Sequence, residues 1–392
     1  MSGAPALGLG PRLVQDVLAP MKAAFVDKDE IVDLLGLCLV AGENLFLLGP
    51  PGTAKSALVQ DLGRRLGGRT FDYLLTRFTE PSELFGPFDI RRLREGDLVT
   101  NTEGMLPEAD LVFLDELLNA NSAILNSLLL ALNERVFRRG RETRALPLLM
   151  VVGASNHLPE DPALGALFDR FLLRVQSRGV PEERLDEVLE AGWRLDTGQP
   201  AAPASGAVGV EEVRALQRLL PEVDLQPVRA AYAGLVRRIR AAGLPLSDRR
   251  AVKVQRLLAA SALLCGRDRT LHSDLWVLRH VWDAEEQVEV LRGIVGQALE
   301  AAAEEPGSHP RARGPEAPDP EALARELEQL ARREALDAGE QARVRDRLAT
   351  LAGRVPWVTH EVQRRALERQ VDLLWQQVGG QPPGAGRAER GR

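Results

Sequence analysis

The feature that most constrains this chain is the eight-residue loop GPPGTAKS, which follows an apolar run and precedes a helical stretch. The apolar run Leu45–Leu48 predicts a buried strand, and Ala57–Leu66, closed by two glycines, predicts a helix. A phosphate-binding loop requires this context, because backbone N–H groups and the helix dipole then face the phosphates. We therefore predict that a nucleoside triphosphate is bound by Gly49, Pro50, Pro51, Gly52, Thr53, Ala54, Lys55 and Ser56.

Two side chains of this loop have predicted roles of their own. Lys55 is expected to reach the terminal phosphates as a point charge, and the Ser56 hydroxyl is expected to bind Mg²⁺. Ala54 stands directly before the lysine, where such loops usually have a second glycine. Because Gly52 still relieves the loop, we interpret it as a variant phosphate loop rather than an inactive one. A chance turn is the alternative for the loop taken alone.

A second motif, LVFLDE at Leu111–Glu116, lies further along the chain. Four apolar residues that end in adjacent carboxylates are typical of a central parallel strand that delivers acid groups to Mg²⁺ and water. Asp115 is predicted to bind Mg²⁺, and Glu116 is predicted to polarise the attacking water. A buried strand ending in a surface acid pair is the alternative for this motif alone. The two motifs together favour a nucleotide-hydrolysing site.

Strand and helix signals alternate over the first half of the chain, which predicts an α/β fold with a parallel sheet and helices on both faces. Strands are expected at Asn44–Leu48, Thr70–Thr76, Leu111–Leu114, Leu146–Ala154 and Phe171–Val175. Residues up to about Pro20 are expected to form an arm with one short helix. Helices are then expected near 31–41, 211–220, 225–242, 247–265 and 273–300.

The chain of 392 residues is long enough for two or three domains. A nucleotide-binding sheet domain is predicted at 1–195, an all-helical domain at 211–300 and a helical C-terminal region at 320–378. Segments rich in Ala, Gly and Pro predict linkers at 196–210 and 304–320.

The composition argues against several classes of function. A net charge of −6 and 4% aromatic residues give no electrostatic footprint and few stacking platforms for nucleic acid. No apolar run is long enough for a membrane span, and the N-terminus lacks the layout of a secretory signal. Cys38 and Cys265 lie in apolar helical surroundings and are expected to be reduced core residues of a cytoplasmic protein. The histidines show no paired spacing, so no zinc site is expected.

Three further positions are candidate catalytic residues. Asn156 ends the apolar strand VVGASN and would orient the attacking water if this strand neighbours the acid pair; alternatively it only turns the chain. Arg170, directly before an edge strand, could project out of its own subunit or form a salt bridge with Asp169. Arg249 or Arg250, at the start of a helix of the second domain, could lie over the phosphates or at a solvated helix start.

The order of these motifs resembles the AAA+ ATPases of the MoxR family. The resemblance spans about Leu18 to Trp282 and is strengthened by the stretches Tyr73–Leu93, Gly104–Leu117 and Ala123–Gly140. They are most similar to the RavA branch, whose ATPases work beside a von Willebrand A-domain protein and usually have alanine before the loop lysine. The resemblance implies a five-stranded sheet domain with a helical lid, assembled as a hexameric ring. It also implies a β-hairpin inserted into helix 2 at about Phe88–Met105.

The resemblance further implies how the site would work. ATP lies between the sheet domain and the lid, and Arg170 of the neighbouring subunit acts as an arginine finger. Arg249, rather than Arg250, senses the γ-phosphate. The favoured function is a chaperone-like motor that remodels a protein client with a von Willebrand A-domain partner. Two alternatives stay open: a nucleic-acid motor, and a scaffold ring that binds nucleotide mainly to hold its shape.

Overall fold

The computed structural model describes residues 7–94, 99–139, 142–159, 162–197, 208–300, 306–312, 320–331 and 361–377, with short pieces at 344–345, 348, 351–352 and 355. The chain forms two compact units, Met1–Ala312 and Arg313–Arg392, each described by itself. Most of the predicted linker 196–210, and parts of the predicted linker 304–320, lie outside the described residues.

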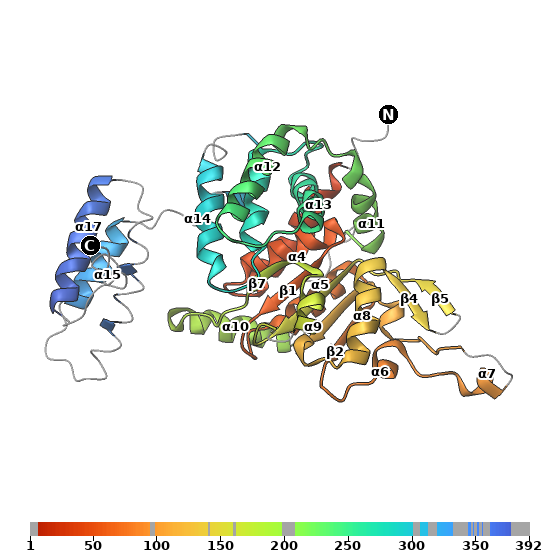
Figure 1. Ribbon diagram of the computed structural model, residues 1–392. Helices are drawn as coiled ribbons and strands as arrows, with labels where there is room; N and C mark the ends of the chain where they lie inside the picture. The colour runs from red at the N-terminus through yellow and green to blue at the C-terminus, as the bar shows by residue number, and fades with distance from the viewer. Residues whose placement is uncertain are drawn as a thin grey trace. The chain divides into compact units, whose positions relative to one another are not determined.

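A parallel sheet of five strands forms the centre of the first unit (Figure 1). Its order is β2-β3-β6-β1-β7, and every neighbouring pair is parallel. The inner strands are almost wholly buried, as expected for a parallel sheet covered on both faces. The predicted α/β fold is therefore confirmed. The strands are β1 (Asn44–Leu48), β2 (Thr70–Leu74), β3 (Leu111–Asp115), β6 (Met150–Ser155) and β7 (Phe171–Gln176).

Helices of the first half of the chain pack against this sheet. Helix α4 (Asp29–Ala41) contacts β1 and β7, whereas α5 (Lys55–Leu66) contacts β2 and β3. Further helices of this part are α6 (Pro81–Phe85), α8 (Ser122–Glu134), α9 (Pro162–Phe168) and α10 (Leu185–Asp196), with short 3-10 turns at Leu106–Glu108, Leu117–Asn119 and Glu182–Arg184.

The N-terminal segment belongs to the core, so the prediction of an arm is wrong. Helix α2 (Leu9–Leu13), the π-helical turn η1 (Val14–Leu18) and α3 (Ala19–Ala24) follow one another without a break. A Cβ added at Gly10 would lie 1.8 Å from the carbonyl oxygen of Leu263, so this end packs directly on a helix of the second half. The apolar residues of this short segment are buried because they face distant parts of the chain.

The helical half of the first unit contains α11 (Val210–Leu219), α12 (Gln226–Ala241), α13 (Asp248–Leu264), the 3-10 segment η6 (His272–His280) and α14 (Gln287–Leu299). The Ser247 side chain caps α13 by accepting a hydrogen bond from the Arg250 N–H. The helix expected at 273–300 is divided, because the chain turns between η6 and α14. Asp283 fixes this turn by pairing with Arg174 and Arg250.

Residues 306–312 pack on the helical half rather than forming a free linker. The ring of His309 stacks on Trp276 with ring centroids 4.8 Å apart, and Trp276 also contacts His280 edge-on. Arg311 forms an ion pair with Asp33 at 2.6 Å. The predicted linker 304–320 is therefore ordered in part, because these side chains have buried partners far away in the sequence.

Two buried histidines predict a pH-dependent stability. Burial lowers the pKa of both His280 and His309 to about 4, from 6.5, although Glu30 near His280 opposes the shift. Since the unfolded chain then binds more protons, stability should fall as the pH drops from about 6.5 towards 4, by about 2 kcal/mol at pH 5 for one such histidine. Urea unfolding at pH 7 and pH 5 measures this. His309→Phe keeps a stacked ring and should lose part of the dependence; an unchanged pH profile would contradict it.

Two segments at the edge of the sheet differ from the prediction. Within its described residues, 88–94 and 99–105, the expected hairpin pairs at its base through an antiparallel bridge between Phe88 and Thr100. Between them lies helix α7 (Ile90–Arg94), which begins there because the Asp89 side chain accepts the N–H groups of Arg91 and Arg92. A second hairpin, β4 (Val136–Arg139) with β5 (Glu142–Ala145), was not predicted, although the Arg139-Gly140 pair is a turn signal.

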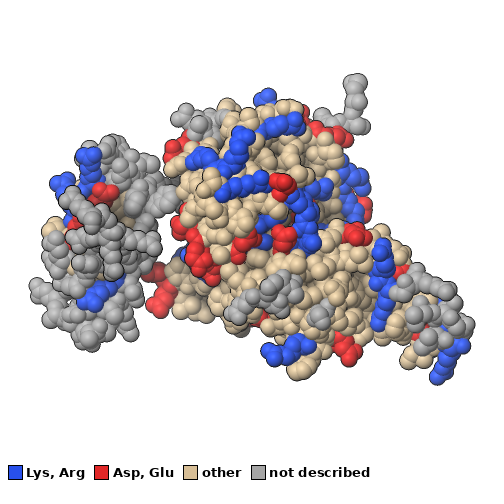
Figure 2. All heavy atoms as spheres, viewed as in Figure 1, with Lys and Arg blue, Asp and Glu red and all other residues tan. Residues whose placement is uncertain are grey.

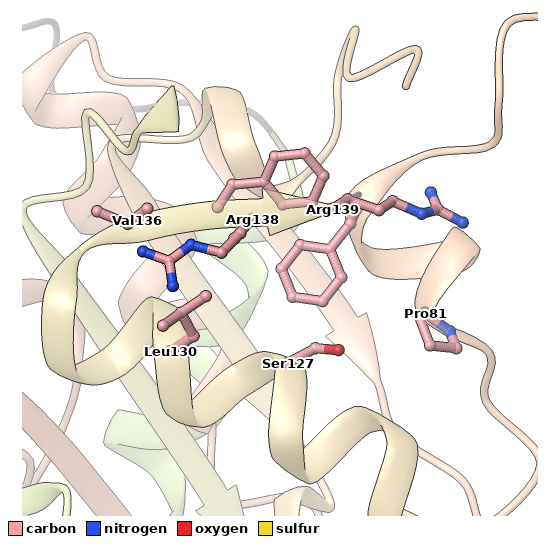
Figure 3. Close-up of a pocket in the computed structure, with 8 residues that line it drawn as sticks. Pro81, Ser127, Leu130, Val136, Arg138 and Arg139 are labelled. Carbon is pink, nitrogen blue, oxygen red and sulfur yellow. The ribbon is translucent and has the colours of Figure 1, made fainter. Parts of the chain in front are cut away.

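The two segments contact each other. The guanidinium of Arg139 lies 3.9 Å from the centre of the Phe88 ring and donates a hydrogen bond to the carbonyl of Gly86. Figure 3 shows a pocket beneath β4, with Arg138 and Arg139 extending towards its opposite ends. No residue of the phosphate loop lines this pocket, so it is not the nucleotide site.

The second unit is helical where it is described. Helices α15 (Pro320–Ala331) and α17 (Glu361–Gln377) contact each other and enclose a separate apolar cluster. The members of this cluster are Leu323, Leu327, Leu348, Leu351, Val355, Leu367, Val371, Leu374 and Trp375. A helical C-terminal region is thus observed, with its own core.

Candidate nucleotide-binding site

The phosphate loop connects the carboxyl end of β1 to the start of α5, as predicted. A Cβ at Gly49 would lie 2.0 Å from the carbonyl oxygen of Ser177, and Gly52 has a φ of +81°. Both positions therefore require glycine. The first turn of α5 has no side-chain cap, so its N–H groups can face an anion. These features fit a bound triphosphate.

The loop is held by its own side chains and by Ser177, which follows β7. Lys55 is 6% exposed, and its Nζ donates hydrogen bonds to the carbonyl oxygens of Gly49 at 2.8 Å and Pro50 at 2.9 Å. The Thr53 hydroxyl donates to the Pro50 carbonyl at 3.0 Å, and Ser177 Oγ donates to Thr53 Oγ1 at 3.0 Å. The ammonium group thus lies against the loop, where phosphate oxygens can replace its carbonyl partners.

Ala54 takes a conformation that glycine adopts more readily. Its φ is +62° and its ψ is +23°, in the left-handed region. Because the Cβ is strained there, Ala54→Gly should raise the free energy of unfolding by about 1 kcal/mol. Urea unfolding of the two proteins measures the difference. Ala57→Gly, at an ordinary position inside α5, is the matched control and should destabilise; a loss of stability in Ala54→Gly would contradict the argument.

The acid pair lies at the carboxyl end of β3. Asp115 Oδ1 accepts a hydrogen bond from the Glu116 N–H at 2.9 Å. Glu116 has a φ of +48°, a strained position for a residue with a side chain, and such strain occurs at functional sites. Both side chains are partly exposed. The carboxylates are therefore open to a ligand rather than enclosed in the core.

The strand order brings three of the predicted groups to the same edge of the sheet. Strand β6 lies between β3 and β1, so Asn156 follows a strand that neighbours both the acid pair and the phosphate loop. Asn156 is exposed, whereas Ser155 before it is fully buried. The strand that precedes Asn156 therefore neighbours the strand of the acid pair, as the predicted role of Asn156 requires. Its role towards water stays a prediction.

Arg249 lies at the amino end of β7, away from the phosphate loop of its own chain, and its role as a γ-phosphate sensor stays a prediction. It forms an ion pair with Asp169, two residues before β7 begins. The six residues of β7, which run parallel to β1, span roughly 20 Å and separate Asp169 from the level of the phosphate loop. The start of α13 packs on this end because Arg250 beside it is anchored there.

Arg170 lies beside that pair but does not join it. Asp169 is paired with Arg249 and approached by Arg250 at 4.0 Å, so the alternative of a salt bridge between Asp169 and Arg170 is not observed. The Arg170 Nε and Nη1 atoms are buried and have no hydrogen-bond partner among the described residues. Arg170 thus has two donors that no described residue satisfies.

Sequence reasoning missed a buried arginine network behind this end. Arg174, in the middle of β7, is fully buried and contacts Asp283 at 2.7 Å and the carbonyl of Trp282 at 2.7 Å. Burial, with the nearby charge of Arg250, lowers the pKa of Arg174 to about 9. Arg250 is 3% exposed and donates both to Asp283 and to the Val281 carbonyl. A lone arginine inside the apolar strand FLLRVQ was the available signal.

This network distinguishes the two candidate arginines of α13. Arg250 is enclosed and ties the helical half to β7, whereas the Arg249 side chain is 44% exposed. Arg249 is therefore the more accessible of the two arginines, and the choice between them as nucleotide sensor stays a prediction.

Fold and site together define an AAA+ ATPase fold, a parallel sheet with a phosphate loop followed by a helical lid. Residues 12–218 match the MoxR domain of the MoxR-vWA-beta-propeller ternary systems, and residues 229–295 match an AAA lid domain. The chain belongs to the MoxR family of AAA+ ATPases.

The chain is also similar to individual proteins. The chain is 34% identical to the uncharacterized protein MJ0079 of Methanocaldococcus jannaschii, over 72% of this chain and 73% of that protein. It is 26% identical to the chaperone MoxR1 of Mycobacterium tuberculosis, over 51% of this chain and 52% of that protein. A crystal structure of a candidate ATPase from Cytophaga hutchinsonii has the same fold, with a TM-score of 0.61 and 19% identity over 76% of this chain and 96% of that chain.

None of the described helices is long and apolar enough to cross a membrane. No group of three or more His, Cys, Asp or Glu side chains in the described ranges could hold a metal ion. A magnesium ion needs no such cage, because it can use one carboxylate, a hydroxyl and phosphate oxygens.

Proposed function

We propose that this protein hydrolyses ATP as a ring-forming motor whose catalytic site is completed between two subunits. One observation carries the proposal: the phosphate loop, acid pair and Asn156 lie at the carboxyl ends of the strands, whereas Arg170 and Arg249 lie at the amino end of β7. A single chain cannot bring both sets to one nucleotide. A head-to-tail contact between two copies of the chain can bring both sets to one nucleotide. When the same contact is repeated around an axis, the copies close into a ring.

Within one subunit, the loop residues bind the triphosphate of the substrate ATP through their N–H groups and Lys55. Mg²⁺, when held by Ser56 and Asp115, would neutralise phosphate charge. Glu116 polarises the attacking water, and Asn156 aligns it with the γ-phosphate. These roles need exposed side chains at neighbouring strand ends, which is the arrangement described above.

The neighbouring subunit supplies the arginines. Arg170 offsets the charge that develops on the transferred phosphoryl group, as an arginine finger does. Arg249 of the same neighbouring subunit leaves Asp169 for this γ-phosphate, so Asp169 is a resting partner that ATP replaces. Because Arg250 and Arg174 join the lid to β7, movement of Arg249 is transmitted to the sheet domain. ATP and ADP then favour different lid positions.

The proposed motor uses ATP hydrolysis to remodel a protein complex in the cytoplasm, with a von Willebrand A-domain protein as its partner. Support comes from the matched MoxR domain, described from systems that contain such a protein, and from the relative named as a chaperone. We further propose a hexamer and membership of the RavA branch. We propose a sheet domain at 1–195, a lid at 211–300 and a helical C-terminal region at 320–378, with a linker at 196–210.

The test is the steady-state ATPase rate per subunit over a wide range of protein concentration. A rate that rises cooperatively with concentration, together with a matching rise in mass, supports a site made between subunits. A fixed monomer mass with an unchanged rate per subunit would contradict it. Addition of the von Willebrand A-domain protein should then raise the rate.

A nucleic-acid motor is the second candidate, and one observation favours it. Arg91, Arg92, Arg94 and Arg138 lie on the two edge segments and form no ion pair within the described residues. Stimulation of the ATPase by single-stranded DNA, but not by the protein partner, would select this candidate.

A further inference from the structure

Helix α10 carries an apolar face that nothing in the described residues covers. None of its residues is buried. Leu185, Leu189 and Trp193 are 53%, 63% and 70% exposed, and their spacing of four places them in one row on the helix. Three large apolar side chains in a row are more than the scattered exposure that is ordinary for a protein surface. We call this row the α10 face.

The α10 face belongs to the phosphate-loop end of the molecule. Helix α10 follows the carboxyl end of β7, and Ser177 in the connection donates a hydrogen bond to Thr53 of the phosphate loop. The helix runs out from the body of the first unit (Figure 1). A second chain that brings its Arg170 to this loop must approach the end of the sheet that α10 flanks. The α10 face therefore continues the contact of the proposed function.

The opposite end of the molecule offers a complementary surface. At the start of α13, Val252 is 65% exposed, one turn after Arg249. Figure 2 shows Lys and Arg side chains gathered over α12 and α13. Arg229 and Arg237 of α12 are exposed and form no ion pair in the described residues. Residues 182–196, by contrast, contain six acidic residues and two arginines. The signs of charge are complementary, which favours encounter in one orientation.

We propose that the α10 face binds a second copy of this chain, on the surface around Val252 at the start of α13. The contact is head-to-tail, since it joins two different surfaces, and it holds the neighbour's lid where Arg249 and Arg170 meet the nucleotide. The inference rests on the proposed function and adds to it the residues that hold the ring together. Burial of the three side chains stabilises the contact by apolar area removed from water.

Cross-linking between different variants tests the geometry. Leu189→Cys and Val252→Cys are placed in separate chains that also carry Glu116→Gln, mixed with ATP, and treated with a short bismaleimide. Cross-linked dimers should form in the mixture and not with either chain alone. The matched control is Ile90→Cys, which is 67% exposed on α7 and should not cross-link to Val252→Cys. Cross-linking of Leu189→Cys to itself would indicate a symmetric contact and overturn the proposal.

Assembly of a second variant separates this inference from the proposed function. Leu189→Ser with Trp193→Ser changes only exposed side chains, so the monomer should keep its thermal stability. Its ATPase rate per subunit should fall by about 10³-fold, as on loss of an arginine finger, and its mass with ATP should fall to that of a monomer. A variant that still assembles and hydrolyses like wild type overturns the inference and leaves the proposed function standing. Failure of the wild type itself to assemble rejects both.

A third result would identify which protein binds the α10 face. If the double variant assembles and hydrolyses normally but no longer responds to the von Willebrand A-domain protein, the α10 face binds that partner, and a second copy is excluded as its occupant.

Discussion

Arg170→Ala should lower the ATPase rate per subunit by about 10³–10⁵-fold, the contribution measured for arginine fingers. The loss should be this large because the guanidinium stabilises charge that is present mainly in the transition state, so the ground state does not share the effect. Nucleotide binding should change little. Single-turnover hydrolysis and equilibrium binding of a fluorescent ATP analogue measure the two quantities separately.

Two controls sharpen this result. Arg218→Ala removes an exposed arginine of α11 and should leave the rate unchanged. Mixing Arg170→Ala with Glu116→Gln should restore part of the activity, because some contacts then combine an intact acid pair with a neighbour's Arg170. If mixing restores nothing while both proteins still assemble, the arginine does not act on the neighbouring subunit.

Glu116→Gln should lower the ATPase rate by about 10²–10⁴-fold, the usual contribution of a general base. The amide has nearly the shape of the carboxylate but cannot accept the proton of the attacking water. ATP binding should persist, because the phosphate loop and Asp115 are untouched. The rate and the affinity for the fluorescent analogue are measured on the same preparation.

The matched control for this carboxylate is Glu103→Gln, an exposed glutamate in the loop before β3, which should hydrolyse ATP like wild type. Lys55→Ala provides the opposite case, since it should lose affinity for ATP as well as activity. Hydrolysis at the wild-type rate by Glu116→Gln would remove this residue from the mechanism.

The strands and the phosphate loop could be predicted because their formation depends on residues that are neighbours in the sequence. Strand β1 was predicted with its observed bounds, since an apolar run followed by a glycine loop has few other foldings. Gly49 and Gly52 are required by close approach and positive φ, which are properties of the loop itself. The order of the motifs also predicted the MoxR family, and the comparisons confirm this family.

Side chains that act through distant partners could not be predicted in this way. The sequence of the N-terminal segment does not show that Gly10 packs against Leu263, so it was predicted to be an arm. The pattern around Asp283 is helical, and the turn there forms because two arginines bind this carboxylate. Periodicity reports which face of a segment is apolar, but not what covers that face. Helix α7 likewise depends on a single capping side chain.

By itself, the sequence determined that this chain has a phosphate loop, an acid pair and a parallel sheet, because these depend on residues that are neighbours along the chain. The tertiary structure alone decided where the arginines lie. Strand order brought Asn156 beside the acid pair, and the pairing of Arg249 with Asp169 placed it at the far end of β7. Such placements follow from contacts between segments about eighty residues apart, whose energies no local pattern records.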